Sequence, residues 1–256
     1  MSKRPNILWY CTDQQRFDTI QALGNSFVRT PVLDSLVKEG TSFTHTYCQS
    51  PICTPSRASF MSGLYPSRVH NTRNGNESFP GWPPVITKLI SDSGYDCGLI
   101  GKFHLQSSGK RTEPRIEDGF SFWKFSHAPR DDWEEGHDYA DWVRSQGGDL
   151  NKLRESEDRV PTELHQTTWA SERSIEFIQQ EREKPWLLNV NIYDPHPPFT
   201  PQKATPINLT QMICTGPILK TVIWMLRPSW LIATFRMRYA HPRNMTPREH
   251  RHDIMQ

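Results

Sequence analysis

The chain has 256 residues, a net charge of +2, 21 prolines and a hydrophobic content of 35%. This length allows one large domain, and the near-neutral charge gives no electrostatic reason to expect a nucleic acid as partner. The apolar runs are too short for a membrane span or for the core of a secretory signal peptide. Five cysteines at irregular spacing argue against a disulfide framework. We therefore expect a cytoplasmic protein that binds neither membranes nor nucleic acids.

Short apolar runs alternate with helical patterns along the first 200 residues or so. In chain order we expect a strand at 6–11, a helix at 30–40, a strand at 41–47, helices at 53–63 and 84–94, a strand at 95–101, a helix at 163–183 and a strand at 186–192. The polar, aromatic-rich segment 106–160 should hold little regular structure. Strands alternating with helices predict an α/β fold with a mainly parallel sheet and helices on both faces.

Cys53 stands at the start of an expected helix that Thr54 can cap and Gly63 can end. The free N–H groups and the dipole at a helix N-terminus favour an anion. Arg57, one turn later, adds a planar cation suited to oxyanions. A lone cysteine would indicate a packing residue. The combination instead indicates a reactive centre for a phosphate-like or sulfate-like group.

Polar side chains follow three of the predicted strands directly: Asp13 and Gln14, Lys102 and His104, and His196. In a parallel sheet the carboxyl ends of the strands share one edge, where ligands bind. Each residue alone has an ordinary explanation, as a turn cap, a solvated loop side chain or part of a proline-rich turn. Together they predict one anion-binding site, where Asp13 and Gln14 offer oxygen ligands to a hard divalent cation.

The sequence C-T-P-S-R at 53–57, followed by Gly63, resembles the sulfatase family, although Met61 replaces the leucine usual there. A thiol phosphatase loop fits less well, because it separates cysteine and arginine by more than the three residues found here. The resemblance covers about residues 3–200 and implies the alkaline-phosphatase-like fold. In that family a formylglycine-generating enzyme oxidises the cysteine, and the hydrated aldehyde is the nucleophile.

The resemblance also implies a role for each of the other polar residues. The catalytic set would be Cys53, Arg57, Lys102, His104 and His196. The metal ligands would be Asp13, Gln14 and residue 53, with Ca²⁺ as the expected ion and Mg²⁺ or Mn²⁺ as alternatives. Gln14 replaces a second aspartate and makes this metal site one charge less negative. Substrate contacts would come from Lys102, His196 and Asn74, although Asn-Gly is also an ordinary turn.

The family's later metal ligands, an aspartate followed by asparagine or histidine, lack a counterpart after Phe199. Residues 200–256 carry two acidic and eight basic side chains and show no clear helical or strand period. We expect residues 1–204 to form an incomplete catalytic core and residues 205–256 to be an aberrant or divergent tail, produced by a frame error or a truncation. Missing ligands predict weak calcium binding and a turnover of aryl sulfates that is negligible beside ordinary enzymatic rates.

Two classes of function fit these patterns. The first is a hydrolase that cleaves a small-molecule sulfate monoester, with a phosphonate or phosphodiester hydrolase of the same superfamily as its close rival. The second is a non-catalytic remnant that keeps part of the core and binds anions. Aldehyde formation at Cys53 together with measurable turnover would separate the two.

Overall fold

The computed structural model describes residues 4–108, 112–131, 135–155 and 160–199. Its elements in chain order are β1 (Ile7–Thr12), η1 (Gln21–Leu23), α1 (Pro31–Glu39), α2 (Cys53–Ser62), α3 (Ile86–Asp92), β2 (Asp96–Gly101), β3 (Phe122–Phe125), α4 (Asp138–Ser145), α5 (Leu150–Glu155), η2 (Thr162–Leu164), α6 (Gln166–Gln179) and β4 (Trp186–Ile192). The predicted domain boundary at 204 and the predicted tail at 205–256 lie outside the described residues.

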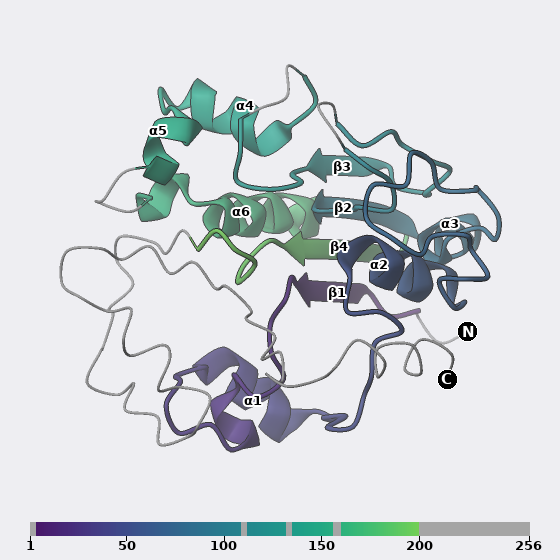
Figure 1. Cartoon of the computed structure of the whole chain (residues 1–256), viewed down its shortest axis with the longest axis horizontal. Helices are drawn as coiled ribbons and strands as arrows, with labels where there is room; N and C mark the ends of the chain where they lie inside the picture. Colours follow the sequence, from purple (N-terminus) through teal and green to yellow (C-terminus); the bar gives the residue numbers. More distant parts are fainter. Residues whose placement is uncertain (1–3, 109–111, 132–134, 156–159, 200–256) are drawn as a thin grey trace, which may run out of the picture. The chain divides into compact units, whose positions relative to one another are not determined.

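The four described strands form one parallel sheet in the order β1-β4-β2-β3. Figure 1 shows their arrows pointing the same way, so their carboxyl ends share one edge. The last strand in the chain, β4, lies between β1 and β2 and pairs with both along its length. This arrangement confirms the predicted parallel sheet.

Side chains alternate between the two faces of the sheet, and each face has its own apolar cluster. In β2, Cys97 and Leu99 pack on the cluster that includes Ala58 and Met61 of α2. Ile100 points to the opposite face, where the cluster includes residues of α4, α5 and α6. Parallel sheets need apolar cover on both faces. Helices on both faces were predicted, and the two clusters confirm them.

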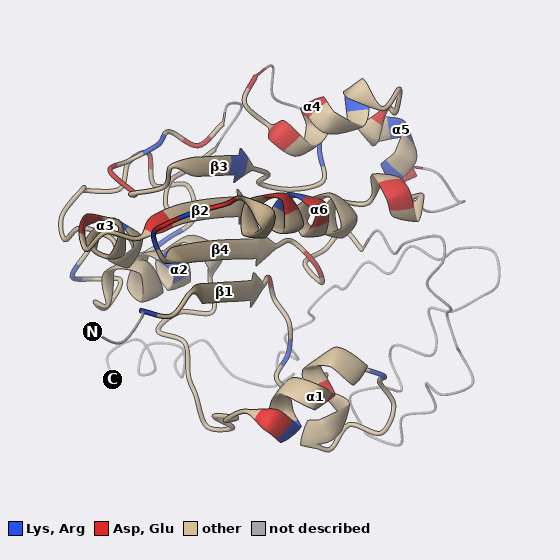
Figure 2. Ribbon diagram, turned by 180° about the vertical axis from the view of Figure 1, so that it is seen from behind, with Lys and Arg blue, Asp and Glu red and all other residues tan. Residues whose placement is uncertain are grey.

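The helices α4, α5 and α6 carry charged residues of both signs. Figure 2 shows acidic and basic residues interspersed along α4, α5 and α6. The first of these helices, for example, carries Asp138, Asp141 and Arg144. Among the described residues no helix is long and apolar enough to cross a membrane.

The predicted strand at 41–47 is wrong, because this segment forms turns and irregular backbone. Its aromatic side chains Phe43 and Tyr47 are 80% and 79% exposed, so the alternating pattern has no apolar face to pack against. A strand also needs a neighbouring strand to satisfy its backbone groups. Alternation alone therefore did not identify a strand here.

The expectation that residues 106–160 hold little regular structure is also wrong. The segment contains β3, α4 and α5, which have four, eight and six residues. Elements this short do not complete enough periods for a pattern to stand out among charges and aromatics. The buried residues Phe125, Tyr139 and Leu150 nevertheless fix all three elements on the sheet.

Gly101 ends β2 in a left-handed conformation, with a φ of +91°. A β-carbon there would lie 2.0 Å from the carbonyl oxygen of Asn191 in β4. We predict that Gly101→Ala lowers the free energy of unfolding by about 4 kcal/mol or more, because backbone strain and a backbone clash add together. Urea unfolding followed by circular dichroism measures this loss.

Gly147→Ala is the matched control, because Gly147 has a φ of +75° with nothing within 4 Å of an added β-carbon. Left-handed strain alone should cost about 1 kcal/mol there. Equal losses in the two variants would contradict the proposed clash.

Candidate active site

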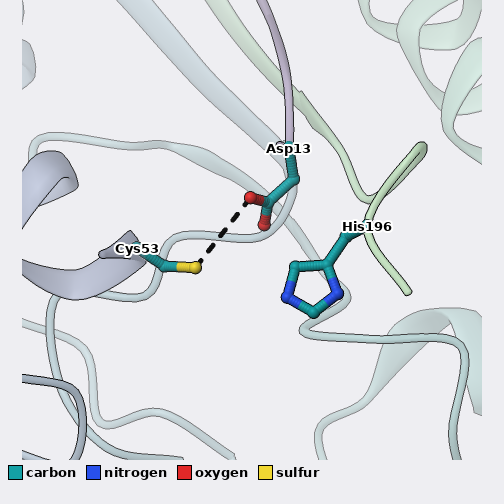
Figure 3. Close-up of side chains that lie close together, drawn as sticks. All are labelled: Asp13, Cys53 and His196. Atoms are coloured by element: carbon teal, nitrogen blue, oxygen red, sulfur yellow. Dashed lines mark hydrogen bonds between the residues drawn. The ribbon is translucent and has the colours of Figure 1, made fainter. Parts of the chain in front are cut away.

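Three strand ends and one helix start meet at the carboxyl edge of the sheet. Asp13 follows β1, Lys102 follows β2, His196 lies in the loop after β4, and Cys53 is the first residue of α2. The N–H of Asp13 donates to the carbonyl oxygen of Asp194 at 3.3 Å, which joins the ends of β1 and β4. Figure 3 shows Asp13, Cys53 and His196 facing one another across this edge.

Asp13 is the centre of a buried charge cluster. Its Oδ2 lies 2.6 Å from Nζ of Lys102 and 3.6 Å from Nη2 of Arg57. The two cations are 2% and 3% exposed, and Asp13 is 6% exposed. Two buried cations thus share one carboxylate at contact distance. Since a buried charge is costly without a partner, this cluster favours the binding of an anion beside Asp13.

The first turn of α2 places Cys53 and Arg57 on the same side of the helix, toward Asp13. The Sγ of Cys53 lies 3.9 Å from Oδ1 of Asp13. Arg57 also donates from Nη1 to the carbonyl oxygen of Lys102 at 2.8 Å. Its guanidinium is therefore fixed by a charge on one side and by the backbone of the loop after β2 on the other.

His104 has a positive φ of +56°, which turns the loop sharply after Lys102. Its Nε2 shares a hydrogen bond of 3.1 Å with Oγ1 of Thr54, and its ring packs edge-on against that of His127 at 4.4 Å. Nδ1 is buried and has no hydrogen-bond partner in the described part of the chain. Burial lowers the pKa of His104, and nearby His127 and Lys102 lower it further. The imidazole is therefore neutral at physiological pH.

His196 is only half buried, unlike His104. Its Nδ1 shares a hydrogen bond with the carbonyl oxygen of Pro197, and its ring is tilted against that of Tyr193 with 4.6 Å between the ring centroids. Burial lowers its pKa, with a further contribution from the charge of Lys102. His196 thus borders both the charge cluster and solvent, a suitable place for exchanging a proton with a bound group.

Asp13, Cys53 and His196 each offer one ligand atom, and these three atoms lie within 4.8 Å of one another. Lys102 and Arg57 engage Oδ2 of Asp13, whereas Oδ1 faces Cys53 and is the oxygen that a cation would use. Gln14, the adjacent residue, is exposed and has a φ of +59°. The carboxylate and amide oxygens suit a hard cation, but a thiol sulfur does not.

The N-terminus of α2 is capped by a different residue from the one predicted. Thr54 is not its cap; Ile52 occupies that position and makes no side-chain cap bond. Asn74 supplies the missing acceptor, because its Oδ1 receives the N–H of Thr54 at 3.0 Å. The substrate contact expected of Asn74 stays a prediction. Gly63 ends the helix in a left-handed conformation, as predicted.

Sequence reasoning missed two residues of this site, the buried Glu113 and the partly buried His127. Glu113 accepts the backbone N–H groups of three consecutive residues in the loop after β2. His127 comes two residues after the end of β3 and packs against His104. The strand-end rule would have identified His127 had β3 been predicted. A single glutamate in an irregular segment carries no comparable signal.

Burial lowers the pKa of His127 to about 3 and that of His137 to about 4. Both values lie below the usual pKa of about 6.5 in an unfolded chain. Below pH 6.5 these histidines are protonated in the unfolded chain but stay neutral in the folded chain. The free energy of unfolding therefore falls as the pH falls. We predict that the Cε1–H resonances of His104, His127 and His137 do not shift between pH 8 and pH 5 in the folded protein.

The same resonances in urea-unfolded protein provide the control and should titrate with a midpoint of about 6.5. A folded-state resonance of His127 that moved with that midpoint would show that the ring is not buried as described.

Comparisons with known proteins identify relatives of this chain. The family model described as "Sulfatase" matches residues 5–210. The chain is 31% identical to the uncharacterized sulfatase YidJ of Escherichia coli K12 over 214 residues, which cover 77% of this chain and 40% of that protein. It is 29% identical to the arylsulfatase of Clostridium perfringens over 218 residues, covering 78% of this chain and 45% of that enzyme.

Among solved structures, the phosphonate monoester hydrolase of Agrobacterium radiobacter superposes with a TM-score of 0.62 at 24% identity. The match covers 78% of this chain and 43% of that enzyme, and at this identity it shows a shared fold. The chain thus spans less than half the length of these relatives. The family match over residues 5–210, which agrees with the parallel sheet, shows that this chain belongs to the sulfatase family.

Proposed function

We propose that this chain carries the catalytic site of a hydrolase that cleaves a small-molecule sulfate monoester, with residue 53 as formylglycine. One observation carries the proposal: buried Arg57 and Lys102 converge with Cys53 on Asp13 at the N-terminus of α2. A sulfate group bound beside Cys53 would meet two fixed cations and the free N–H groups of the helix. Family membership supports the reaction class.

Arg57 and Lys102 would provide most of the electrostatic stabilisation of the transition state. Charge builds up on the sulfate oxygens during transfer, and donors fixed before the reaction stabilise it without reorganising. The guanidinium is already held by Asp13 and by the carbonyl oxygen of Lys102. The same contacts orient the loop that carries Lys102, so both cations keep one geometry.

The two histidines would handle protons in different ways. His104 is buried and neutral, and it shares a hydrogen bond with the hydroxyl of Thr54. It would hold a hydroxyl of the hydrated aldehyde at residue 53. His196 is half buried beside the cluster and would protonate the departing alcohol oxygen.

Oxidation of Cys53 would also change the character of the metal site. Replacing the thiol by a hydrated aldehyde puts oxygen where sulfur lies 3.9 Å from Asp13. Asp13, Gln14 and residue 53 would then hold a divalent cation, Ca²⁺ in our proposal, with oxygen atoms alone. When bound, the cation would supply positive charge to the sulfate oxygens. The activating partner would be a formylglycine-generating enzyme, encountered in the cytoplasm.

A phosphonate or phosphodiester hydrolase is the second candidate. Gln14 favours it, because the family resemblance implies that phosphonate and phosphodiester hydrolases share the Asp-Gln pair found here at 13 and 14. Sulfate monoesters, phosphonate monoesters and phosphodiesters each carry one negative charge, so the charge beside the metal does not by itself separate these substrates. The choice between sulfate and phosphonate esters depends on comparing the two substrates directly.

We predict that Cys53 is converted to an aldehyde when the chain is expressed with a formylglycine-generating enzyme. Mass spectrometry of peptides containing residue 53 should show the mass loss of thiol-to-aldehyde conversion. Arg57→Ala should lower the converted fraction, because Arg57 belongs to the recognised sequence at 53–57. Arg68→Ala, at an exposed position on the same segment, is the control and should convert normally. Complete alkylation of Cys53 as a free thiol would contradict the prediction.

We predict slow hydrolysis of an aryl sulfate by the converted chain in the presence of Ca²⁺. Cys53→Ala should lower this rate at least about 100-fold, since it removes the nucleophile. An aryl phosphonate monoester, assayed in parallel, should react more slowly than the sulfate. Equal rates for Cys53→Ala and the converted chain would favour an anion-binding remnant. Faster phosphonate cleavage would favour the second candidate.

A further inference from the structure

Glu113 lies in the connection between β2 and β3 and is 4% exposed. Its Oε2 accepts the backbone N–H of His104 at 2.5 Å. Its Oε1 accepts the N–H groups of Leu105 at 2.5 Å and of Gln106 at 2.9 Å. One buried carboxylate therefore receives three consecutive backbone N–H groups from the loop after β2.

Consecutive N–H groups that converge in this way form a concave anion-binding nest when one residue is left-handed. His104, with a φ of +56°, supplies that left-handed residue. Such a nest commonly binds an external anion, but here a side chain of the same protein fills it. The carboxylate thereby offsets the strain of a non-glycine residue at positive φ.

The loop that Glu113 holds is the one that carries the charged residues of the site. Arg57 fixes the carbonyl oxygen of Lys102 at 2.8 Å, and the side-chain amide of Asn71 donates to the carbonyl oxygen of Leu105 at the same distance. These contacts bind the carbonyl groups of the loop, whereas Glu113 binds its N–H groups. The backbone from Lys102 to Gln106 is thus held through both kinds of polar group.

We propose that Glu113 is a positioning residue, whose carboxylate fills the nest at His104–Gln106 and so fixes Lys102 and His104 in the anion-binding site. It contacts neither substrate nor metal in this scheme and acts through the loop. The catalytic role of Glu113 rests on the proposed function of the chain. Its structural role in holding the loop does not depend on that function.

The protonation state of Glu113 bears on how firmly the nest is filled. Burial raises its pKa to about 7, and the three N–H bonds and the charge of Arg57 act in the opposite direction. An ionised carboxylate accepts hydrogen bonds about twice as strong as a neutral acceptor does. A neutral side chain at this position should therefore hold the three N–H groups less firmly.

Hydrogen exchange of backbone amides in the full chain tests the positioning role directly. Glu113→Ala should speed exchange at His104, Leu105 and Gln106 at least about 10-fold, because their acceptor is gone. Glu113→Gln keeps an oxygen but replaces its partner by an amide N–H donor. We expect it to lose protection at one or two of the three amides. Because its shape matches glutamate, this variant remains informative if Glu113→Ala does not fold.

Asp118→Asn is the matched control. Asp118 is another buried carboxylate on the same connection, and it accepts the N–H of Phe120 at 2.9 Å just before β3, away from the carboxyl edge. Its loss should destabilise the protein yet leave exchange at His104–Gln106 within about two-fold of wild type. Sodium formate, which can enter the emptied nest, should restore protection at these amides in Glu113→Ala. In Asp118→Asn it should leave exchange at these amides unchanged, because Glu113 still fills the nest.

Affinity for inorganic sulfate, measured by calorimetry without turnover, separates positioning from stability. We expect Glu113→Ala to bind sulfate at least about 10-fold more weakly and Asp118→Asn to bind it as wild type does. Unchanged amide exchange at His104–Gln106 in folded Glu113 variants would overturn the proposal, as would unchanged sulfate affinity. If wild type hydrolyses no ester, the proposed function fails, while the exchange and formate results still decide the role of Glu113.

Discussion

The contact between Asp13 and Lys102 determines how this site is built. The two residues follow β1 and β2, which are not neighbours, because β4 lies between them in the sheet. Their 2.6 Å contact therefore crosses the end of the central strand. Arg57 of α2 also contacts Asp13, so one carboxylate connects the ends of β1 and β2 with the helix α2. Removing Asp13 would leave the buried charges of Lys102 and Arg57 without the carboxylate that balances them, a strongly destabilising change.

The position of the site could be predicted from the sequence because ligands bind at the carboxyl ends of parallel strands, and three of those strands were predicted correctly. The apolar runs of β1, β2 and β4 are short and uninterrupted, and the structure has them within one residue of the predicted bounds. Once those strands are known to be parallel, the polar residues that follow them must share an edge. The helix at Cys53 was identifiable from its closing Gly63, whose left-handed conformation few other residues adopt readily.

The parts that escaped prediction are held by contacts between distant residues. Glu113 binds backbone N–H groups, which every residue except proline possesses, so its partners leave no pattern in the sequence. Asn74 caps α2 from 20 residues away, whereas the usual capping signal lies within the helix start. His127 depended on β3, a strand of four residues. In each case the interacting residues lie further apart in the sequence than the few residues that a capping or turn signal covers.

The charge cluster is buried, whereas the end of the sheet at β1 is only partly covered by the described residues. Asp13, Arg57 and Lys102 contact one another directly and are all buried, so the ionic contacts that define the charge cluster lie within the described residues. The strand β1, by contrast, ends the described sheet, and its Leu8 and Tyr10 are 53% and 52% exposed. Parallel strands are usually covered on both faces. Lys102, His196 and Arg57 are carried by β2, β4 and α2, whereas Asp13, which binds both Lys102 and Arg57, follows the end strand β1.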